Sequence, residues 1–595
     1  MKISRIYSNF ESEFSTVDFH DGFNVILGRV FNKTLKSTDA HNLGKSKLAE
    51  LIDFCLLKGR HKTFFLFEFF SVFEKYEFYI ELKLNSGEFL TVKRGVSKNT
   101  RIFLRKHSKA KQCFRGLEDA LWDYSDLAID KARLVLDSYL NLLVIDPWSY
   151  RDAIAYCLRG QDDYTDVFQL DKHRGQHVYW KPYVGHLLGF DSHSLKRNYL
   201  LKSEVEALRE EIAKLKSAIG LTAGDQEETI LNLLDVKKNQ VSDLEWQLEN
   251  FNFDSTDVLY IEELADGINS QISDLNNLRY YLSARLKKLN KSLASSDVKI
   301  ELDSLSQLFE ESGVIFDGQL KRTFGELVEF NRKITIERQG FIFQQIGELE
   351  SELVEIASSI SELSEERSKK LGYLRSQDVF LKYQEVSDLL SEQKSYIYEL
   401  NRRLEVNSSV KSMEADCRKL IREKDEVVEK IRMNRDSVIR SNDGIYKGIK
   451  EHFANFVTDV LNKDGVLITE QNAEGNLEYS AGLLNGLGRI TGESDGHSYK
   501  KMLCIGFDIA VAMAYSKMEF VRFLYHDGGL ETLDDRKKIE FIEYVRTASS
   551  LSGIQYILTT IDSDVPDGVV FSEYELARVL HDEGSSGRLF NIPTW

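Results

Sequence analysis

The sequence predicts an α/β protein in which two terminal lobes flank a long antiparallel α-helical coiled coil. A short apolar run and a Gly-Lys-Ser motif near the N-terminus are typical of a strand and a helix around a phosphate-binding loop. The middle of the chain repeats apolar residues at alternating steps of four and three, which is typical of a coiled coil. The C-terminal part returns to mixed strand and helix patterns. We expect the lobes and coil to comprise residues 1–191, 192–440 and 441–595.

The phosphate-binding loop is the first predicted element. Residues 23–27 indicate a buried strand that ends at Gly28, and Gly44-Lys45-Ser46 begins a helical pattern. Loop amides and a helix N-terminus bind phosphates, the lysine neutralises their charge, and the serine hydroxyl binds Mg²⁺. Fifteen residues separate Gly28 from Gly44, whereas the usual motif has four between its glycines. A chance match to Gly-Lys-Ser is therefore the alternative.

The N-terminal lobe contains further strand patterns and a basic run. Strands are expected at residues 3–7, 76–84 and 88–92, and the last two form a hairpin around Asn85-Ser86-Gly87. Residues 101–115 hold six basic and no acidic side chains. Such a run binds the phosphates of DNA or RNA, or it is an exposed loop. The predicted nucleic-acid contacts are Arg101, Arg105, Lys106 and Lys109.

Composition limits the class of protein. The 595-residue chain is too long for one core and carries a net charge of −17, yet residues 1–115 hold 21 basic against 12 acidic side chains. A basic lobe on an acidic protein favours an anionic partner such as DNA, with a solvated surface as the alternative. The five cysteines lie far apart, which is typical of free thiols in the cytoplasm. We expect no signal peptide and no membrane span, because no apolar run reaches about 18 residues.

The coiled coil is predicted as two legs, roughly residues 195–292 and 318–440. The apolar seam positions of its two most regular stretches are Leu201, Val205, Leu208, Ile212, Leu215 and Ile219, and Ile342, Ile346, Leu349, Leu353, Ile356, Ile360 and Leu363. Glycine, asparagine and aspartate interrupt the pattern, so helix breaks are expected near residues 220–225, 251–256 and 375–378.

A coiled coil made by one chain must fold back on itself. The expected apex is residues 295–318. The simplest pairing then places residues 195–250 against 378–440 and residues 257–292 against 318–375.

The C-terminal lobe contains the remaining patterns. A hairpin is expected at residues 464–478, and a glycine-rich loop and a helix over residues 502–515 follow it. Residues 520–525 are strand-like and lead into His526-Asp527-Gly528. Residues 554–558 are also strand-like and lead into two threonines.

This layout resembles that of the SMC/RecN-like ABC ATPases, in which both ends of the chain form one head. Over most of its length the chain also resembles a narrower family of prokaryotic RecN-like ATPases from phage-defence islands. That family is often classed with ABC-three-component systems and is similar in organisation to the ATPases of Lamassu- and Menshen-type loci. A long phosphate loop is expected in it. The segments that carry the resemblance are residues 23–28, 41–46, 51–56, 187–191, 526–528 and 554–559.

The resemblance implies a bipartite ABC-type ATPase head with ATP and Mg²⁺ as its ligands. The implied ATP contacts are Gly28, Asn42, Gly44, Lys45, Ser46, Lys47, Gln161, Ser494, Gly496 and Ser498. Residues 494–498 resemble a degenerate signature loop, which caps the ATP of the opposite subunit, although a plain glycine-rich turn is the alternative. Ser46 and Asp527 are the implied Mg²⁺ ligands. Residues 532–535 stand at the D-loop, and Thr560 stands at the switch position.

The catalytic candidates are Lys45, Asp527 and Glu531. Most ABC ATPases place a glutamate directly after the metal-binding aspartate, where it polarises the attacking water. Here Gly528 occupies that position. Glu531 is the candidate substitute, with a structural role as the alternative. The missing glutamate suggests slow turnover.

These implications lead to one functional prediction. The protein is expected to be a cytoplasmic, slowly hydrolysing ATPase that forms a homodimer through its heads and contacts DNA. As a sensor in antiphage defence, it would regulate accessory and effector subunits, such as a nuclease, encoded nearby. A RecN-type DNA-repair ATPase and a non-enzymatic coiled-coil scaffold are the alternatives.

Overall fold

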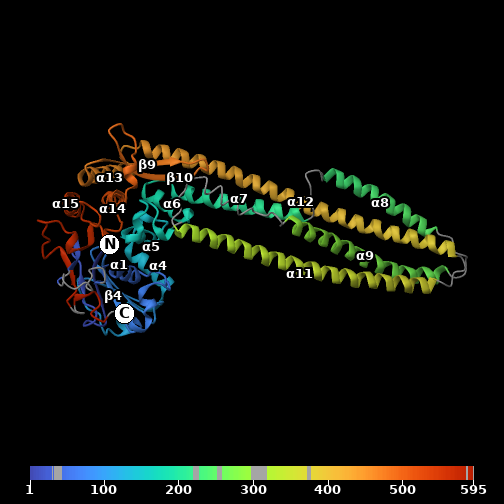
Figure 1. Cartoon of the computed structure of the whole chain (residues 1–595), viewed down its shortest axis with the longest axis horizontal. Coiled ribbons are helices and arrows are strands. Elements are labelled where there is room, and N and C mark those ends of the chain that lie inside the picture. The colour runs from blue at the N-terminus through green and yellow to red at the C-terminus, as the bar shows by residue number, and fades with distance from the viewer. Residues whose placement is uncertain are drawn as a thin grey trace. The chain divides into compact units, whose positions relative to one another are not determined.

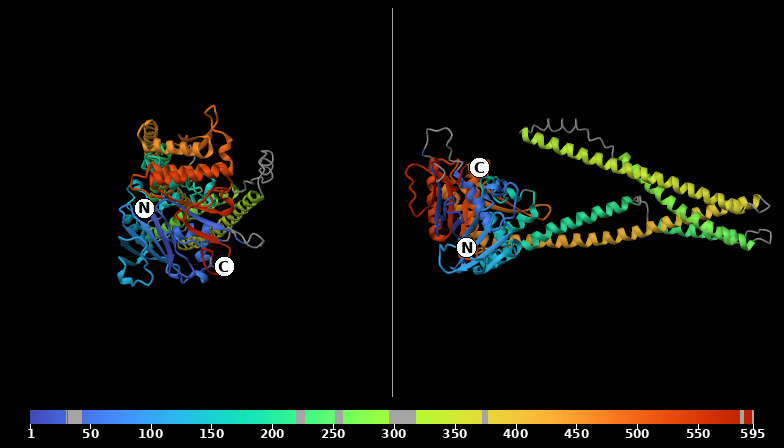
Figure 2. Two further views of the ribbon diagram at one scale, coloured as in Figure 1. Left: turned by 90° about the vertical axis from the view of Figure 1, so that its left-hand side faces the viewer. Right: turned by 90° about the horizontal axis from the view of Figure 1, so that it is seen from below.

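The computed structural model describes residues 1–29, 31, 43–173, 175–218, 227–250, 258–295, 318–371, 377–583 and 587–593. The chain divides into two compact units. Unit 1 is Met1–Val205 with Leu420–Trp595, and unit 2 is Glu206–Lys419. Unit 1 therefore contains both ends of the chain, and its N-terminal (blue) and C-terminal (red) segments lie together in every view (Figures 1 and 2).

A five-stranded parallel sheet forms the centre of unit 1, in the order β13-β3-β12-β11-β8. Its strands are β3 (Phe23–Arg29), β8 (Leu158–Arg159), β11 (Phe523–His526), β12 (Gln555–Ile561) and β13 (Leu576–His581). β3 pairs with β12 from Phe23 opposite Tyr556 to Gly28 opposite Ile561. The strands expected near residues 23–27, 520–525 and 554–558 are confirmed, with ends shifted by a few residues. Strands from both ends of the chain thus share one sheet.

An antiparallel sheet forms a second layer of unit 1, in the order β2-β1-β4-β5-β6-β7. Its strands are β1 (Lys2–Ser8), β2 (Val17–Asp18), β4 (Glu77–Lys83), β5 (Phe89–Gly95), β6 (Arg101–His107) and β7 (Tyr124–Ala128). The predicted hairpin is confirmed, because Glu77 lies opposite Gly95 and Lys83 opposite Phe89. The first half of the basic run is strand β6 and not a loop, since it extends this sheet along β5.

Helices cover both sheets. They are α1 (Lys45–Cys55), α2 (Phe65–Glu68), α3 (Phe70–Phe73), α4 (Ile129–Leu140), α5 (Tyr150–Cys157), α6 (His177–Leu187), α13 (Ile445–Leu461), α14 (His497–Ala514) and α15 (Asp535–Ser552). The expected C-terminal hairpin is β9 (Asp464–Gln471) and β10 (Leu477–Leu484). α14 lies in the core, and every residue from Lys501 to Ala512 is buried. Two of these buried residues, Lys501 and Asp508, are charged and contact the candidate site.

Three arginines bind the C-terminal end of α1. Arg94, Arg133 and Arg151 donate hydrogen bonds to the carbonyl groups of residues 54–58 at 2.6–3.0 Å. Cations at a helix C-terminus interact favourably with the helix dipole, by about 0.3–1 kcal/mol each. These contacts fix the far end of the helix that begins at Lys45.

Two long helices, α7 (Ser192–Ala218) and α12 (Gln377–Arg440), belong partly to each unit. Within unit 1, Arg197 of α7 pairs with Glu423 of α12 at 2.8 Å. Lys202 of α7 pairs with Glu474, in the turn between β9 and β10, at 2.8 Å. These contacts join the roots of both helices within unit 1.

In its described residues unit 2 is helical apart from Asn250, and it adds α8 (Glu227–Glu249), α9 (Val258–Ser295) and α11 (Gly318–Leu371). α8 packs against α12 through Ile230, Leu234 and Leu400. α9 packs against α11 through an apolar cluster that includes Leu282 and Leu349. These are the two pairings that the heptad pattern predicts. The expected breaks near residues 220–225, 251–256 and 375–378 lie outside the described residues, apart from residues 377–378, which begin α12. The expected apex, apart from its end residues, also lies outside them.

Candidate nucleotide-binding site

The two ends of the long loop after β3 meet at Lys45. Gly44 caps α1 with a φ of 92°, a left-handed conformation that glycine adopts without strain. Lys45 is the first residue of α1 and is buried. A Cβ atom on Gly28 would lie 3.3 Å from Nζ of Lys45, so the ammonium group packs against bare backbone. A side chain at Gly28 would therefore occupy the space beside the ammonium group of Lys45. Asn42 lies outside the described residues.

Ser46 and Asp527 meet although they are 481 residues apart in the sequence. Oγ of Ser46 donates a hydrogen bond to Oδ2 of Asp527 at 2.6 Å. Thr559 donates to the other oxygen of Asp527 and accepts from the N–H group of Gly528 at 3.0 Å. Since β12 lies between β3 and β11, the carboxyl ends of these parallel strands meet at one edge of the sheet. Hydroxyl and carboxylate oxygens are the ligands that Mg²⁺ prefers.

The carboxylate of Glu531 fills the space beside Gly528. A Cβ atom on Gly528, whose φ is 67°, would lie 2.9 Å from three atoms of that carboxyl group. Nε2 of Gln161 lies 3.4 Å from Oε1 of Glu531. Lys501 donates to the carbonyl oxygen of Gly528 at 3.0 Å, and its Nζ lies 3.8 Å from Oε2 of Glu531. Burial lowers the pKa of Lys501, and the negative charges of Glu531 and Asp527 oppose that shift.

A buried ion pair, which sequence reasoning missed, holds the segment around Gln161. Arg159, the last residue of β8, makes two hydrogen bonds to Asp508 of α14 at 2.7 and 3.0 Å. The carbonyl oxygen of Arg159 accepts from the N–H group of Asp527 at 3.2 Å. Its guanidinium group also donates to the carbonyl oxygens of Asp163, Asp166 and Val167. The one sequence signal was an aspartate within an apolar helix, because a buried carboxylate requires a partner.

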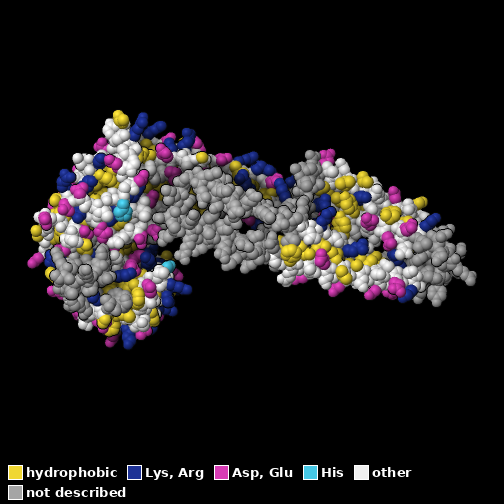
Figure 3. Space-filling view, viewed as in Figure 1, with side chains coloured by type: hydrophobic (Ala, Val, Ile, Leu, Met, Phe, Trp, Pro, Cys, Tyr) yellow, Lys and Arg dark blue, Asp and Glu magenta, His cyan; other side chains and the backbone are white. Residues whose placement is uncertain are grey.

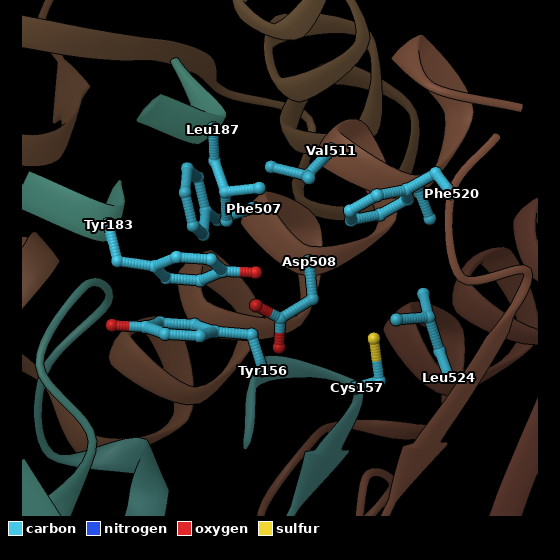
Figure 4. Close-up of a pocket in the computed structure, with 10 residues that line it drawn as sticks. Tyr156, Cys157, Tyr183, Leu187, Phe507, Asp508, Val511, Phe520 and Leu524 are labelled. Carbon is cyan, nitrogen blue, oxygen red and sulfur yellow. The ribbon is translucent and has the colours of Figure 1, made fainter. Parts of the chain in front are cut away.

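His526 extends this buried network to β12. Its Nε2 lies 3.1 Å from Oδ2 of Asp508, and its Nδ1 lies 2.7 Å from the hydroxyl of Tyr556. Burial lowers the pKa of His526, although Asp508 opposes the shift. Figure 4 shows the carboxylate of Asp508 beside Tyr156 in the wall of a small, mostly apolar cavity of about 10 Å³. Such a space holds at most about one water, so Asp508 depends on Arg159 and His526 for its partners.

The two candidate serines near the start of α14, Ser494 and Ser498, have different surroundings. Ser494 is buried, and its Oγ accepts from the N–H group of Leu483 at 2.8 Å. Ser498, in the first turn of α14, donates to the carbonyl oxygen of Thr532 at 2.9 Å. Gly496 caps α14 and is exposed. Gly496 and Ser498 therefore lie at the accessible N-terminus of α14, whereas the hydroxyl group of Ser494 is hydrogen-bonded to the backbone of β10.

Two predicted residues, Lys47 and Thr560, contact neighbouring residues of their own elements. Lys47 pairs with Glu50 of the same helix at 2.8 Å. Thr560, the expected switch residue, donates to the carbonyl oxygen of Ile561 at 3.4 Å, and it is Thr559 that contacts Asp527. Neighbouring residues of a strand point to opposite faces, so a difference of one position decides which threonine reaches the site.

The predicted nucleic-acid contacts lie on β6 and in the turn after it: Arg101, Arg105, Lys106 and Lys109. Two of them have acidic neighbours, because Arg101 lies 3.7 Å from Asp126 and Lys106 lies 2.6 Å from Glu88. Over the face of unit 1 seen in Figure 3, lysine and arginine side chains are interspersed with aspartate and glutamate. The local charge of the run is thus smaller than its sequence indicates.

The described residues also bear on two other classes of site. None of the described helices combines the length and apolar character that a membrane crossing requires. Within the same residues, no three histidine, cysteine, aspartate or glutamate side chains gather into a group that could hold a metal ion.

Comparisons with known proteins give the following similarities. A family model described as "Uncharacterised protein conserved in bacteria (DUF2326)" matches residues 456–594. One similar solved structure is an Smc head domain with a coiled coil and joint from Pyrococcus yayanosii, with 13% identity, 99% of this chain and 96% of that chain covered, and a TM-score of 0.36. Another is an Smc head domain with an extended coiled coil, bound to the C-terminal domain of ScpA, from Pyrococcus furiosus, with 11% identity, 98% and 93% covered, and a TM-score of 0.32. No curated protein matches the sequence.

Proposed function

We propose that the protein binds ATP with Mg²⁺ at Gly28, Gly44, Lys45, Ser46 and Asp527, and hydrolyses the ATP slowly. The observation that carries this proposal is the 2.6 Å hydrogen bond between Ser46, at the start of α1, and Asp527, directly after β11. The absence of a side chain at Gly28, beside the ammonium group of Lys45, supports it. A helix N-terminus, a buried lysine and a hydroxyl–carboxylate pair are the parts that hold a triphosphate and its cation.

Each residue has a distinct part in the proposed reaction. Lys45 and the N-terminal amides of α1 bind the outer phosphates, and Ser46 and Asp527 hold the cation. Mg²⁺, when bound, neutralises charge on the transferring phosphoryl group. Glu531 orients the attacking water and accepts its proton, while Gln161 and Lys501 hold its carboxylate. Turnover is slow because the ammonium group of Lys501 competes with water for that carboxylate.

The test of this proposal is the Lys45→Ala variant. We expect this variant to lose measurable ATP binding. Its melting temperature should stay close to that of the wild type, because a lysine in a phosphate loop interacts with the ligand more than it stabilises the core. Titration with a fluorescent ATP analogue measures the affinity. Lys58→Ala is the matched control, since Lys58 lies just after α1 and pairs with Asp53. Equal affinities of wild type and Lys45→Ala would refute the site.

The proposal extends to assembly and partners. Two heads would enclose two ATP molecules, and Gly496 and Ser498 of each chain would complete the site of the other. The exposed N-terminus of α14 supports this arrangement, because it leaves a helix end accessible to a second chain's phosphate. The resemblance to phage-defence ATPases supports a role in passing a signal to accessory and effector subunits, such as a nuclease.

DNA is the proposed anionic partner of the head. Arg101, Arg105, Lys106 and Lys109 are its proposed contacts. Because Arg101 and Lys106 have acidic neighbours, binding by one head is expected to be weak and independent of sequence. Replacing all four residues with alanine should flatten the salt dependence of DNA binding, by about one unit of slope per lost phosphate contact.

A further inference from the structure

Residues 587–593, called here the C-terminal strap, contact the backbone directly before Lys45. The N–H group of Leu589 donates to the carbonyl oxygen of Leu43 at 3.1 Å. The side chain of Leu589 is buried. A Cβ atom on Gly44 would lie only 2.9 Å from Cβ of Leu589. The strap therefore covers the peptide that leads into α1 so closely that a glycine is required beneath it.

The strap is anchored on its other side to the antiparallel sheet. Phe590 pairs with Phe14 as an isolated antiparallel bridge, and its ring is buried. Asn591 donates from its backbone N–H group to the carbonyl oxygen of Glu13 at 2.7 Å, and from its side chain to that of Ser12 at 3.1 Å. The rings that lie 5.1–6.2 Å from the ring of Phe590 are Phe14, Phe65, Phe73, Tyr76 and Phe78. The strap thus contacts both the aromatic cluster beside the antiparallel sheet and the end of the phosphate loop.

The conformation of Gly44 explains why such a bridge matters. Gly44 is left-handed, and glycine has more backbone freedom than any other residue, so holding it in one conformation has an entropic cost. The hydrogen bond to Leu43 and the packing of Leu589 offset this entropic cost before any ligand binds. A site whose backbone is already ordered binds its ligand more tightly.

We propose that the C-terminal strap is a positioning element of the nucleotide site, with Leu589 as its central positioning residue. The strap holds Leu43 and Gly44 so that the N-terminus of α1 faces the phosphates of ATP. Binding linkage is reciprocal, so bound ATP also holds the strap in place. This inference rests on the proposed function at Lys45 and Ser46.

The first test compares Leu589→Ala with Leu136→Ala, a buried leucine of α4. Both truncations should lower the melting temperature, since both leave a cavity. Only Leu589→Ala should weaken ATP binding, by about tenfold, which corresponds to about 1.4 kcal/mol. Leu589→Met should restore most of the affinity, because methionine refills the volume. Wild-type affinity in Leu589→Ala would overturn the proposal.

The second test uses the wild-type chain, so it does not depend on a variant that folds. Hydrogen exchange at the amides of Leu589 and Asn591 should slow when ATP and Mg²⁺ are added, and Lys45→Ala should remove that effect. Exchange that saturating ATP leaves unchanged would overturn the strap proposal. If wild type and Lys45→Ala bind ATP equally, the nucleotide site itself is wrong. If ATP binding requires Lys45, but Leu589→Ala keeps its affinity for ATP and hydrogen exchange in the strap does not respond to ATP, only the strap proposal fails.

Discussion

The carboxylate of Glu531 reaches back to the α-carbon of Gly528, where the side chain of a residue after Asp527 would begin. Gly528 has a positive φ of 67°, which a glutamate at that position would adopt only with strain. Glycine accepts the turn, and Glu531 brings a carboxylate into the vacated space. Gln161 and Lys501 then fix its orientation. The carboxylate of Glu531 thus occupies the place that a side chain at position 528 would take.

Replacing Glu531 with glutamine tests this assignment. Glu531→Gln keeps the size of the side chain but removes the base, so phosphate release should fall by about 10²–10⁴-fold while ATP affinity stays close to the wild-type value. Glu540→Gln, an exposed position of α15, is the control for removal of a nearby charge. Unchanged turnover in Glu531→Gln would assign Glu531 a structural role.

The sequence predicted the site residues that local pattern determines. Lys45 and Ser46 begin a helix, and Asp527 ends an apolar strand, so their positions follow from periodicity and motif. It did not predict Lys501 or Asp508, because a charge within an apolar helix does not reveal which distant group it meets. The sequence also could not show whether Thr559 or Thr560 contacts Asp527, because that depends on the exact end of the strand.

At the scale of elements, the helix pairs of unit 2 follow from the heptad pattern. An apolar seam specifies the face that a helix buries, and loop lengths then limit which helix covers it. The contact between the two pairs does not follow from the seams. Arg402 of α12 lies 4.7 Å from the ring centroid of Tyr281 of α9, and Arg367 of α11 pairs with Asp388 of α12 at 3.6 Å. These contacts depend on charged side chains, whose distant partners periodicity could not predict.

A cysteine pair tests the packing of α8 on α12. Leu234 and Leu400 belong to one buried cluster, so Leu234→Cys with Leu400→Cys should be joined within one chain by a short bis-maleimide in a background without Cys113, the exposed native cysteine. Denaturing electrophoresis would detect the looped chain by its altered mobility. Leu233→Cys with Leu400→Cys is the matched control, because Leu233 is 40% exposed and points to another face. Equal crosslinking of both pairs would contradict the packing.

At the scale of the whole molecule, the candidate site requires both ends of the chain. β3 and α1 come from the N-terminal part, and β11 and β12 come from the C-terminal part. Ser46 meets Asp527 only when the two parts share one sheet. The long helices between them begin and end in unit 1, where Arg197 and Glu423 join their roots.

The last prediction concerns a second chain. Each proposed site holds ATP with residues of one chain and exposes it to Gly496 and Ser498 of another, so ATP should join two heads when hydrolysis is blocked. We expect Glu531→Gln with ATP and Mg²⁺ to double its mass in light scattering, relative to the same variant without ATP. When two heads close, the phosphate oxygens of ATP lie at the interface between them. The positive end of the helix dipole at the N-terminus of α14 attracts this negative charge.

A single substitution separates ATP binding from dimerisation. Gly496→Asp in the Glu531→Gln background places a carboxylate at the N-terminus of α14, where it would repel the partner's phosphates. Gly496 has a φ of −60°, which any residue can adopt, so the variant should fold. It should bind ATP with unchanged affinity, because Lys45 and Ser46 are intact, yet remain at the mass of one chain. Dimerisation of this variant, or a mass of Glu531→Gln that ATP leaves unchanged, would show that the heads do not complete each other's sites.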